Sequence, residues 1–113
     1  MPNKLGKDLR IKNPKEFSRI FSKNKSFHKP GVIMLTKQNE LNQPRLGITL
    51  PKKHIKLSVK RNKIKRIIKE SFRLNCKNIK NSDIVILSQR KLNSMSKHNI
   101  QETLKELWIN LKN

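Results

Sequence analysis

The chain has 113 residues, enough for one domain with a modest core, and only 34% of them are hydrophobic. Lys and Arg number 28 against 7 Asp and Glu, so the net charge of +21 calls for a polyanionic partner. No apolar run is long enough to span a bilayer, and the N-terminus has no apolar stretch typical of a secretory signal, so we expect a cytoplasmic protein.

The first half of the chain predicts one helix followed by two strands. Residues 1–10 are expected to be a flexible basic N-terminal segment, and the whole chain, residues 1–113, a single domain. A short helix is predicted over 13–24, because Asn13 can cap it and Pro14 suits its first position. Strands are predicted over 32–36 and 45–50, and the polar segment between them has the composition of a hairpin loop.

A basic helix with two faces is predicted next, with Ser58 as its N-cap. At 3.6 residues per turn, one face carries the apolar residues Ile64, Ile67, Ile68 and Phe72. The opposite face carries Asn62, Lys65, Arg66, Lys69 and Arg73, which we call the basic ridge. The helix is therefore expected to pack on the rest of the domain and to present cations outward.

The last third of the chain predicts a buried strand and a second amphipathic helix. The continuous apolar run DIVILSQ, residues 83–89, has the length of a central strand. Asn99 and Glu102 have the spacing of a capping pair at the start of the final helix. Its apolar stripe should pack on the sheet and consists of Ile100, Leu104, Leu107, Trp108 and Leu111.

Three functions compete for the basic helix besides plain solvation of a charged face. Glu70 is the only acid between residues 58 and 73, whereas solvated helices usually alternate acids and bases. Asn62 and the guanidinium groups of Arg66 and Arg73 suit phosphate and ribose. A membrane-surface helix would need its apolar face free, and a nuclear-import tag is more typical of a disordered run. These observations favour a nucleic-acid surface.

RNA is a better match than duplex DNA. The sequence has no helix-turn-helix spacing and no zinc-finger pattern, and the neighbouring strands can offer an exposed face to an extended single strand. Phe17 and Phe21 lie one helical turn apart and can either fill the core or stack on bases, and the sequence leaves both possibilities open.

Several segments together resemble the protein subunit of bacterial ribonuclease P. VKRNKIKRIIKESFR, residues 59–73, is similar to that family's signature of Arg-Asn-Arg followed by Ile-Lys-Arg. The flanking segments also follow the family's order over nearly the whole chain. They are NPKEFSRIF near the start, PRLGITLPKKH before the signature, DIVILSQRK after it and a Leu-Trp helix at the end. Lys63 stands where the family usually has Arg, which keeps the charge but loses a bidentate donor.

The resemblance implies a fold and a function. The fold would be an α+β two-layer sandwich with a mixed sheet of about four strands, and the signature helix would lie in a left-handed βαβ crossover. The protein would bind a catalytic RNA and the 5′ leader of precursor tRNA, and the holoenzyme would remove the leader hydrolytically. Mg²⁺ would be held by the RNA, so the resemblance implies no catalytic side chain and no metal ligand in the protein, no membrane and no DNA.

The resemblance also implies which residues contact RNA. The surface for the catalytic RNA would consist of Lys60, Arg61, Asn62, Lys63, Lys65, Arg66, Lys69 and Arg73. The cleft for the leader would be lined by Phe17 and Phe21 together with the sheet's exposed face, and edged by Lys52 and Lys53.

Two other functions remain as alternatives to this reading. The first is a ribosomal or general RNA-binding protein without a role in an enzyme. The second is a self-sufficient nuclease, but the seven acids are scattered and suggest no metal cluster. The single Cys76 excludes an internal disulfide, and the three histidines are spread along the chain, which favours solvated or RNA-contacting roles over catalysis.

Overall fold

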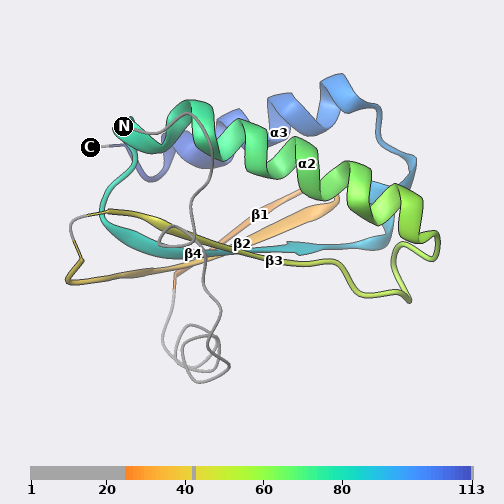
Figure 1. Ribbon diagram of the computed structural model, residues 1–113, viewed down its shortest axis with the longest axis horizontal. Coiled ribbons are helices and arrows are strands. Elements are labelled where there is room, and N and C mark those ends of the chain that lie inside the picture. Colours follow the sequence, from red (N-terminus) through yellow and green to blue (C-terminus); the bar gives the residue numbers. More distant parts are fainter. Residues whose placement is uncertain (1–24, 42, 113) are drawn as a thin grey trace.

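The structure is a computed structural model, and it describes residues 25–41 and 43–112. Four strands and two α-helices follow one another in the order β1, β2, β3, α2, β4, α3 (Figure 1). Short 3₁₀ turns follow α2 and β4. The elements are β1 (Lys25–Lys29), β2 (Val32–Gln38), β3 (Arg45–Thr49), α2 (Ser58–Asn75), η2 (Cys76–Asn78), β4 (Ser82–Ser88), η3 (Arg90–Ser94) and α3 (Lys97–Ile109). The predicted helix over 13–24 and the basic segment 1–10 lie outside the described residues.

The four strands form one mixed sheet in the order β1-β2-β4-β3. β4 pairs antiparallel with β2 and parallel with β3, which confirms the prediction of a buried central strand. The hairpin expected between 32–36 and 45–50 is wrong, because β4 lies between those strands and they do not pair. β2 instead forms its hairpin with β1, a strand that the residue pattern did not reveal. Gly31, at φ +83°, forms part of the tight turn between them.

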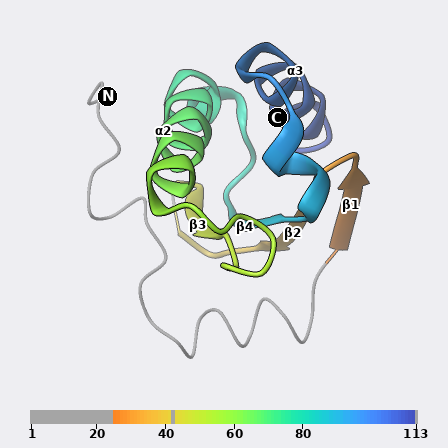
Figure 2. The ribbon, with the colours of Figure 1, turned by 90° about the vertical axis from the view of Figure 1, so that its right-hand side faces the viewer.

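Both helices cover the same face of the sheet, as Figure 2 shows, with α2 over β3 and α3 over β1. Ile64, Ile68 and Phe72 of α2 are at most 2% exposed, and the apolar stripe predicted for α3 is buried as well. The Phe72 and Trp108 rings meet edge to face at 5.8 Å, and Trp108 Nε1 donates a hydrogen bond to Ser71 Oγ at 2.8 Å. This two-layer α+β arrangement confirms the predicted fold class, while the left-handed sense of the β3–α2–β4 crossover stays a prediction.

Both predicted helix caps are wrong by one to three residues. Ser58 is the first residue inside α2, and its N-cap is Leu57, which has no side-chain oxygen to accept a hydrogen bond. α3 begins at Lys97 because Ser96 caps it, and Ser96 Oγ accepts from the backbone N–H of Asn99 at 3.1 Å. Glu102 is paired with Lys105 and is no part of the cap. Neither described helix is long and apolar enough to cross a membrane.

Candidate RNA interface

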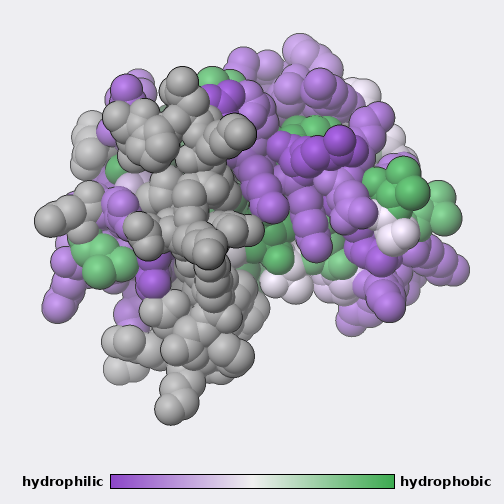
Figure 3. Space-filling view, in the orientation of Figure 1, coloured by the Kyte–Doolittle hydropathy of each residue, from purple (hydrophilic) through white to green (hydrophobic). Residues whose placement is uncertain are grey.

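The basic ridge lies on the side of α2 that faces away from the sheet. The three isoleucines and Phe72 point into the core, so the helical period places the cations opposite them. Asn62 and Arg66 are exposed, and Lys65, Lys69 and Arg73 are half-buried. In the orientation of Figure 1, the surface over α2 is largely hydrophilic (Figure 3). The two-faced helix predicted from the sequence is confirmed.

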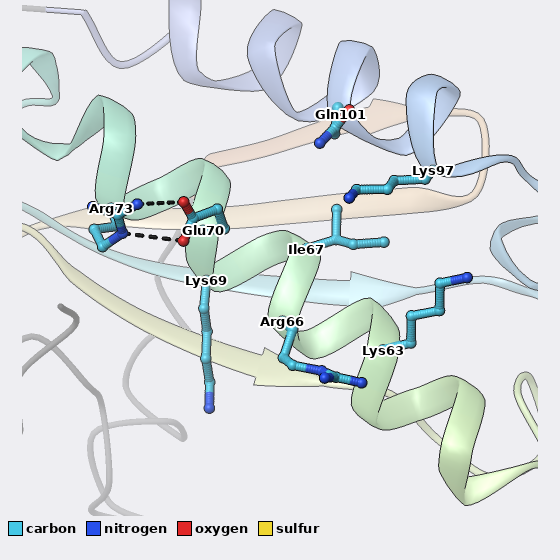
Figure 4. Close-up of a pocket in the computed structure, with 8 residues that line it drawn as sticks. All are labelled: Lys63, Arg66, Ile67, Lys69, Glu70, Arg73, Lys97 and Gln101. Atoms are coloured by element: carbon cyan, nitrogen blue, oxygen red, sulfur yellow. Dashed lines mark hydrogen bonds and ion pairs between the residues drawn. The ribbon is translucent and has the colours of Figure 1, made fainter. Parts of the chain in front are cut away.

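A hollow of about 660 Å³ lies between α2 and α3 beside the ridge. Figure 4 shows Lys63, Arg66 and Lys69 reaching outward from α2, while Lys97 extends from α3 across Ile67. Gln101 of α3 completes this wall. Five of the cationic side chains line the hollow against one acid, Glu70, so its field is strongly positive and suited to phosphate.

Glu70 and Arg73 form a two-point ion pair on the rim of this hollow. Arg73 Nε donates to Glu70 Oε2 at 3.1 Å, and Arg73 Nη2 donates to Glu70 Oε1. The hydrogen bonds from Arg73 lower the pKa of Glu70 against a smaller opposing effect of desolvation, and the charges of Arg73 and Lys97 lower it further. Arg73 is therefore held by a neighbouring acid, and the Nε–Nη2 edge of its guanidinium must exchange that partner before it can bind phosphate at two points.

Replacing Glu70 by Gln is expected to strengthen RNA binding about three- to tenfold, because it frees Arg73 and removes a repulsive charge. The matched control is Glu102→Gln on α3, which removes the same charge from an exposed pair with Lys105 that does not line the hollow. The measurement is an RNA titration at fixed ionic strength. An equal gain in both variants would mean that only net charge matters.

Arg61 acts first as a structural clamp. Its Nη1 donates to the backbone carbonyls of Ile55 at 2.9 Å and of Lys56 at 2.8 Å, which ties the loop after β3 to the first turn of α2. Ile55 is fully buried, so this loop is part of the core. The remaining guanidinium N–H groups have no partner among the described residues and can still face RNA.

Arg61→Gln is expected to destabilise the protein by about 1–2 kcal/mol, because two backbone carbonyls lose a charged donor. The control is Arg66→Gln, because Arg66 is exposed and lies about one turn further along α2. This change should leave the free energy of unfolding within about 0.5 kcal/mol of the unmodified protein. Urea unfolding of both variants separates the two roles. A stable Arg61→Gln protein would argue against the clamp.

A second basic cluster surrounds the start of α2. Lys53, Lys56 and Lys60 line a hollow of about 610 Å³ together with Arg90 of the η3 turn. His54 is fixed beside it, because its Nδ1–H donates to the carbonyl of Ser88 at 2.7 Å. Lys60 Nζ donates to the carbonyl of Asn93. Lys52 is exposed in the same turn but does not line this hollow.

The sheet face turned away from the helices is only partly open. Leu35 and Val85 pair across β2 and β4 and are buried, and Ile33 and Leu87 beside them are partly buried. The predicted exposed face is therefore wrong at its centre and holds at the β1 margin, where Ser26 and His28 are exposed. Phe17 and Phe21, expected beside this face, lie outside the described residues.

Most acids among the described residues serve as ion-pair partners. Asp83 accepts two hydrogen bonds from Arg45, both at 2.8 Å, and one from Asn39 Nδ2 at 3.0 Å. Glu106 pairs with Lys29 at 2.9 Å and so links α3 to β1. No group of three or more His, Cys, Asp or Glu side chains within residues 25–41 and 43–112 could hold a metal ion.

Two parts of this surface were missed by sequence reasoning. Lys97 and Gln101 join the interface from α3, and Arg90 and Asn93 join it from the η3 turn. Recognising Ser96 as the cap would have placed Lys97 in the first turn of α3. Which helix faces that turn depends on packing, so no local signal could have assigned it to the α2 surface.

Comparisons with known proteins agree with this geometry. The family described as Ribonuclease P matches residues 5–112. A ribonuclease P protein component from Pseudoalteromonas translucida is 40% identical over 92% of this chain and 74% of the relative, and one from Vibrio cholerae is 34% identical over 95% and 91%. The ribonuclease P protein structure from Staphylococcus aureus has a TM-score of 0.87 at 34% identity, covering 93% of this chain and 98% of that one. The Thermotoga maritima structure has a TM-score of 0.82 at 29% identity, covering 92% and 98%.

Proposed function

The chain belongs to the ribonuclease P protein family, and from this premise we propose that it binds the catalytic RNA of ribonuclease P and supports removal of the 5′ leader from precursor tRNA. The observation that carries the proposal is the basic ridge of α2, whose apolar side is in the core and whose cationic side is turned outward. A surface of this kind neutralises phosphates and releases their counterions, which is the main source of affinity for RNA.

The ridge and the second basic cluster supply different parts of the contact with the catalytic RNA. Arg66 and Lys69 are offered to phosphate oxygens, and the Asn62 carboxamide can both donate and accept at a ribose or base edge. Lys63 contributes charge beside them, and Lys97 extends the surface onto α3. Arg61 ties the loop after β3 to α2 and Lys60 ties the η3 turn to it, so part of their contribution is to keep this surface in shape.

The chemistry is assigned to the RNA subunit. Mg²⁺ held by that RNA would activate the water and stabilise the leaving oxygen in phosphodiester hydrolysis. The described acids support this division of labour, because Glu70, Asp83, Glu102 and Glu106 are each paired with a Lys or Arg. The protein's own part is to hold the precursor in position and to reduce repulsion between two RNAs.

The 5′ leader is assigned to the basic turn that follows β3. Lys52 and Lys53 are exposed there, and Phe17 and Phe21 would add stacking surfaces. Affinity for leader-bearing precursor relative to mature tRNA should therefore fall steeply with salt, with a log–log slope of about 0.7 for each leader phosphate contacted. A fluorescence titration of both RNAs from low to high salt measures this slope, and parallel curves would contradict a contact with the leader.

The direct test is cleavage of a precursor tRNA by a constant amount of the RNA subunit, with and without this protein, at low Mg²⁺. We expect the protein to raise kcat/KM at least tenfold and to leave a 5′-phosphate on the mature product. A general RNA-binding protein would bind both RNAs without accelerating cleavage. A variant with Arg66 and Lys69 replaced by Gln should support little acceleration at the same concentration, whereas the charge-matched control, Lys77→Gln with Lys91→Gln, should retain most of it.

A further inference from the structure

A third hollow, of about 750 Å³, lies at the end of the molecule remote from the start of α2. The end of β2, the start of β4 and the end of α3 meet there, at the left of Figure 1. Because α2 runs between the two ends and 18 residues of helix span about 27 Å, this hollow is separate from the basic cluster at the start of α2.

The walls of this hollow are held by backbone hydrogen bonds. The N–H of Lys80 donates to the carbonyl of Leu111 at 2.8 Å, and Ile79 and Lys112 form an isolated β-bridge, so the loop before β4 is tied to the segment after α3. The N–H of Asn39 donates to the carbonyl of Asn81 at 3.1 Å and ties the end of β2 to the same loop. The hollow is therefore preformed.

Two hydroxyl groups border it. Thr36 of β2 and Ser82 of β4 are 5% and 4% exposed as whole residues, and no hydrogen bond joins either hydroxyl to the described part of the chain. Among the described residues, Ser88 Oγ is the only fully buried side-chain oxygen or nitrogen without a partner, so both of these hydroxyls still reach the hollow and can donate to or accept from a molecule there. Gln38 stands opposite Ser82 in the strand pairing and Thr36 precedes it by two residues, so all three lie on the helix-facing side of the sheet.

The rim adds charge, carboxamides and one aromatic ring. Lys25 and Lys80 are exposed, and neither side chain forms an ion pair within the described part of the chain. The carboxamides of Gln38 and Asn81 are exposed and have no hydrogen-bonding partner there either. Phe27 of β1 is half-buried and borders the same space. No acidic residue is among the described side chains that line the hollow.

We propose that this hollow binds one unpaired nucleotide of an RNA, with its phosphate at Lys25 and Lys80 and its ribose and base edge at the hydroxyls and carboxamides. A carboxylate only accepts hydrogen bonds, and an inorganic phosphate ion is too small to reach the lysines and the carboxamides together, so either would leave the carboxamide and hydroxyl oxygens largely unused. A base edge and a 2′-hydroxyl both donate and accept, which matches this mixture of groups. The proposal does not depend on the ribonuclease P assignment, because its residues lie away from the ridge.

The test is an NMR titration of the full chain at about 0.15 M salt with a single-stranded RNA pentanucleotide. We expect saturable shifts of the Asn81 and Gln38 side-chain amides and of the Thr36 methyl group. The DNA pentanucleotide of the same sequence should shift them several-fold less, and inorganic phosphate should leave the amides unchanged. Equal shifts with phosphate, DNA or polyglutamate would show a nonspecific cationic patch, and absent shifts with RNA would show no site; either result overturns the proposal.

Three double variants test whether the RNA binds in this hollow and not elsewhere on the protein. Thr36→Val with Ser82→Ala removes both hydroxyls without changing charge, and should weaken the affinity read from the Asn81 amide about tenfold. Lys25→Gln with Lys80→Gln should weaken it by a similar factor. Lys77→Gln with Lys91→Gln removes two exposed lysines that do not line the hollow and should change it less than twofold. The proposal is wrong if the Lys77/Lys91 variant loses as much affinity as the Lys25/Lys80 variant. It is also wrong if the Thr36/Ser82 variant binds the RNA as tightly as the unmodified protein.

Discussion

Replacing Arg66 and Lys69 together by Gln is expected to weaken binding of the catalytic RNA about a hundredfold at 0.15 M salt. Both side chains lie on the outward side of α2 and line the hollow between the helices. Each is expected to lose a charge-assisted contact with phosphate, and together they should reduce the slope of log affinity against log salt by about 1.5. A salt series of binding titrations measures both quantities.

The control for this variant is Lys77→Gln with Lys91→Gln. It also removes two positive charges, but these lysines are exposed and line neither hollow bordering α2. We expect its affinity to fall only about threefold, through the loss of long-range attraction. If both double variants lose affinity equally, binding depends on total charge and the ridge has no special role.

Phe72→Ala is expected to destabilise the protein by about 3–5 kcal/mol, a large part of the total stability of a domain of this size. Its ring is fully buried on the inner side of α2 and packs edge to face on Trp108 of α3. The truncation would leave a cavity between the helices and the sheet, and the ridge would lose its support. Urea unfolding followed by circular dichroism measures the effect.

Leu74→Ala is the matched control, since Leu74 lies two residues further along the same helix but is 66% exposed. We expect it to change the free energy of unfolding by no more than about 0.5 kcal/mol. Saturating RNA should restore part of the folded population of the Phe72→Ala protein, because a ligand of the native state stabilises it. Similar losses in the two variants would mean that α2 does not pack as described.

The local patterns of the sequence predicted α2, α3 and three of the four strands well. The 3.6-residue period placed Ile64, Ile68 and Phe72 in the core, and the apolar run at 83–89 identified the central strand. Strand β1, KSFHK, was missed because it is short, at the edge of the sheet and mostly exposed, so it has little apolar signal. The helix caps were displaced by one to three residues, because neighbouring polar residues compete for the cap.

The sequence alone determined that the basic ridge lies on the side of α2 opposite its apolar, core-facing residues. Helical geometry places residues three and four positions apart on one face without any tertiary contact. Only the tertiary structure decided the strand order, the clamp that Arg61 makes on the loop after β3, and the position of Lys97 across Ile67 in the wall of the hollow. These features join segments that are distant along the chain or depend on how a loop closes, and their energies come from packing and pairing that no local period encodes.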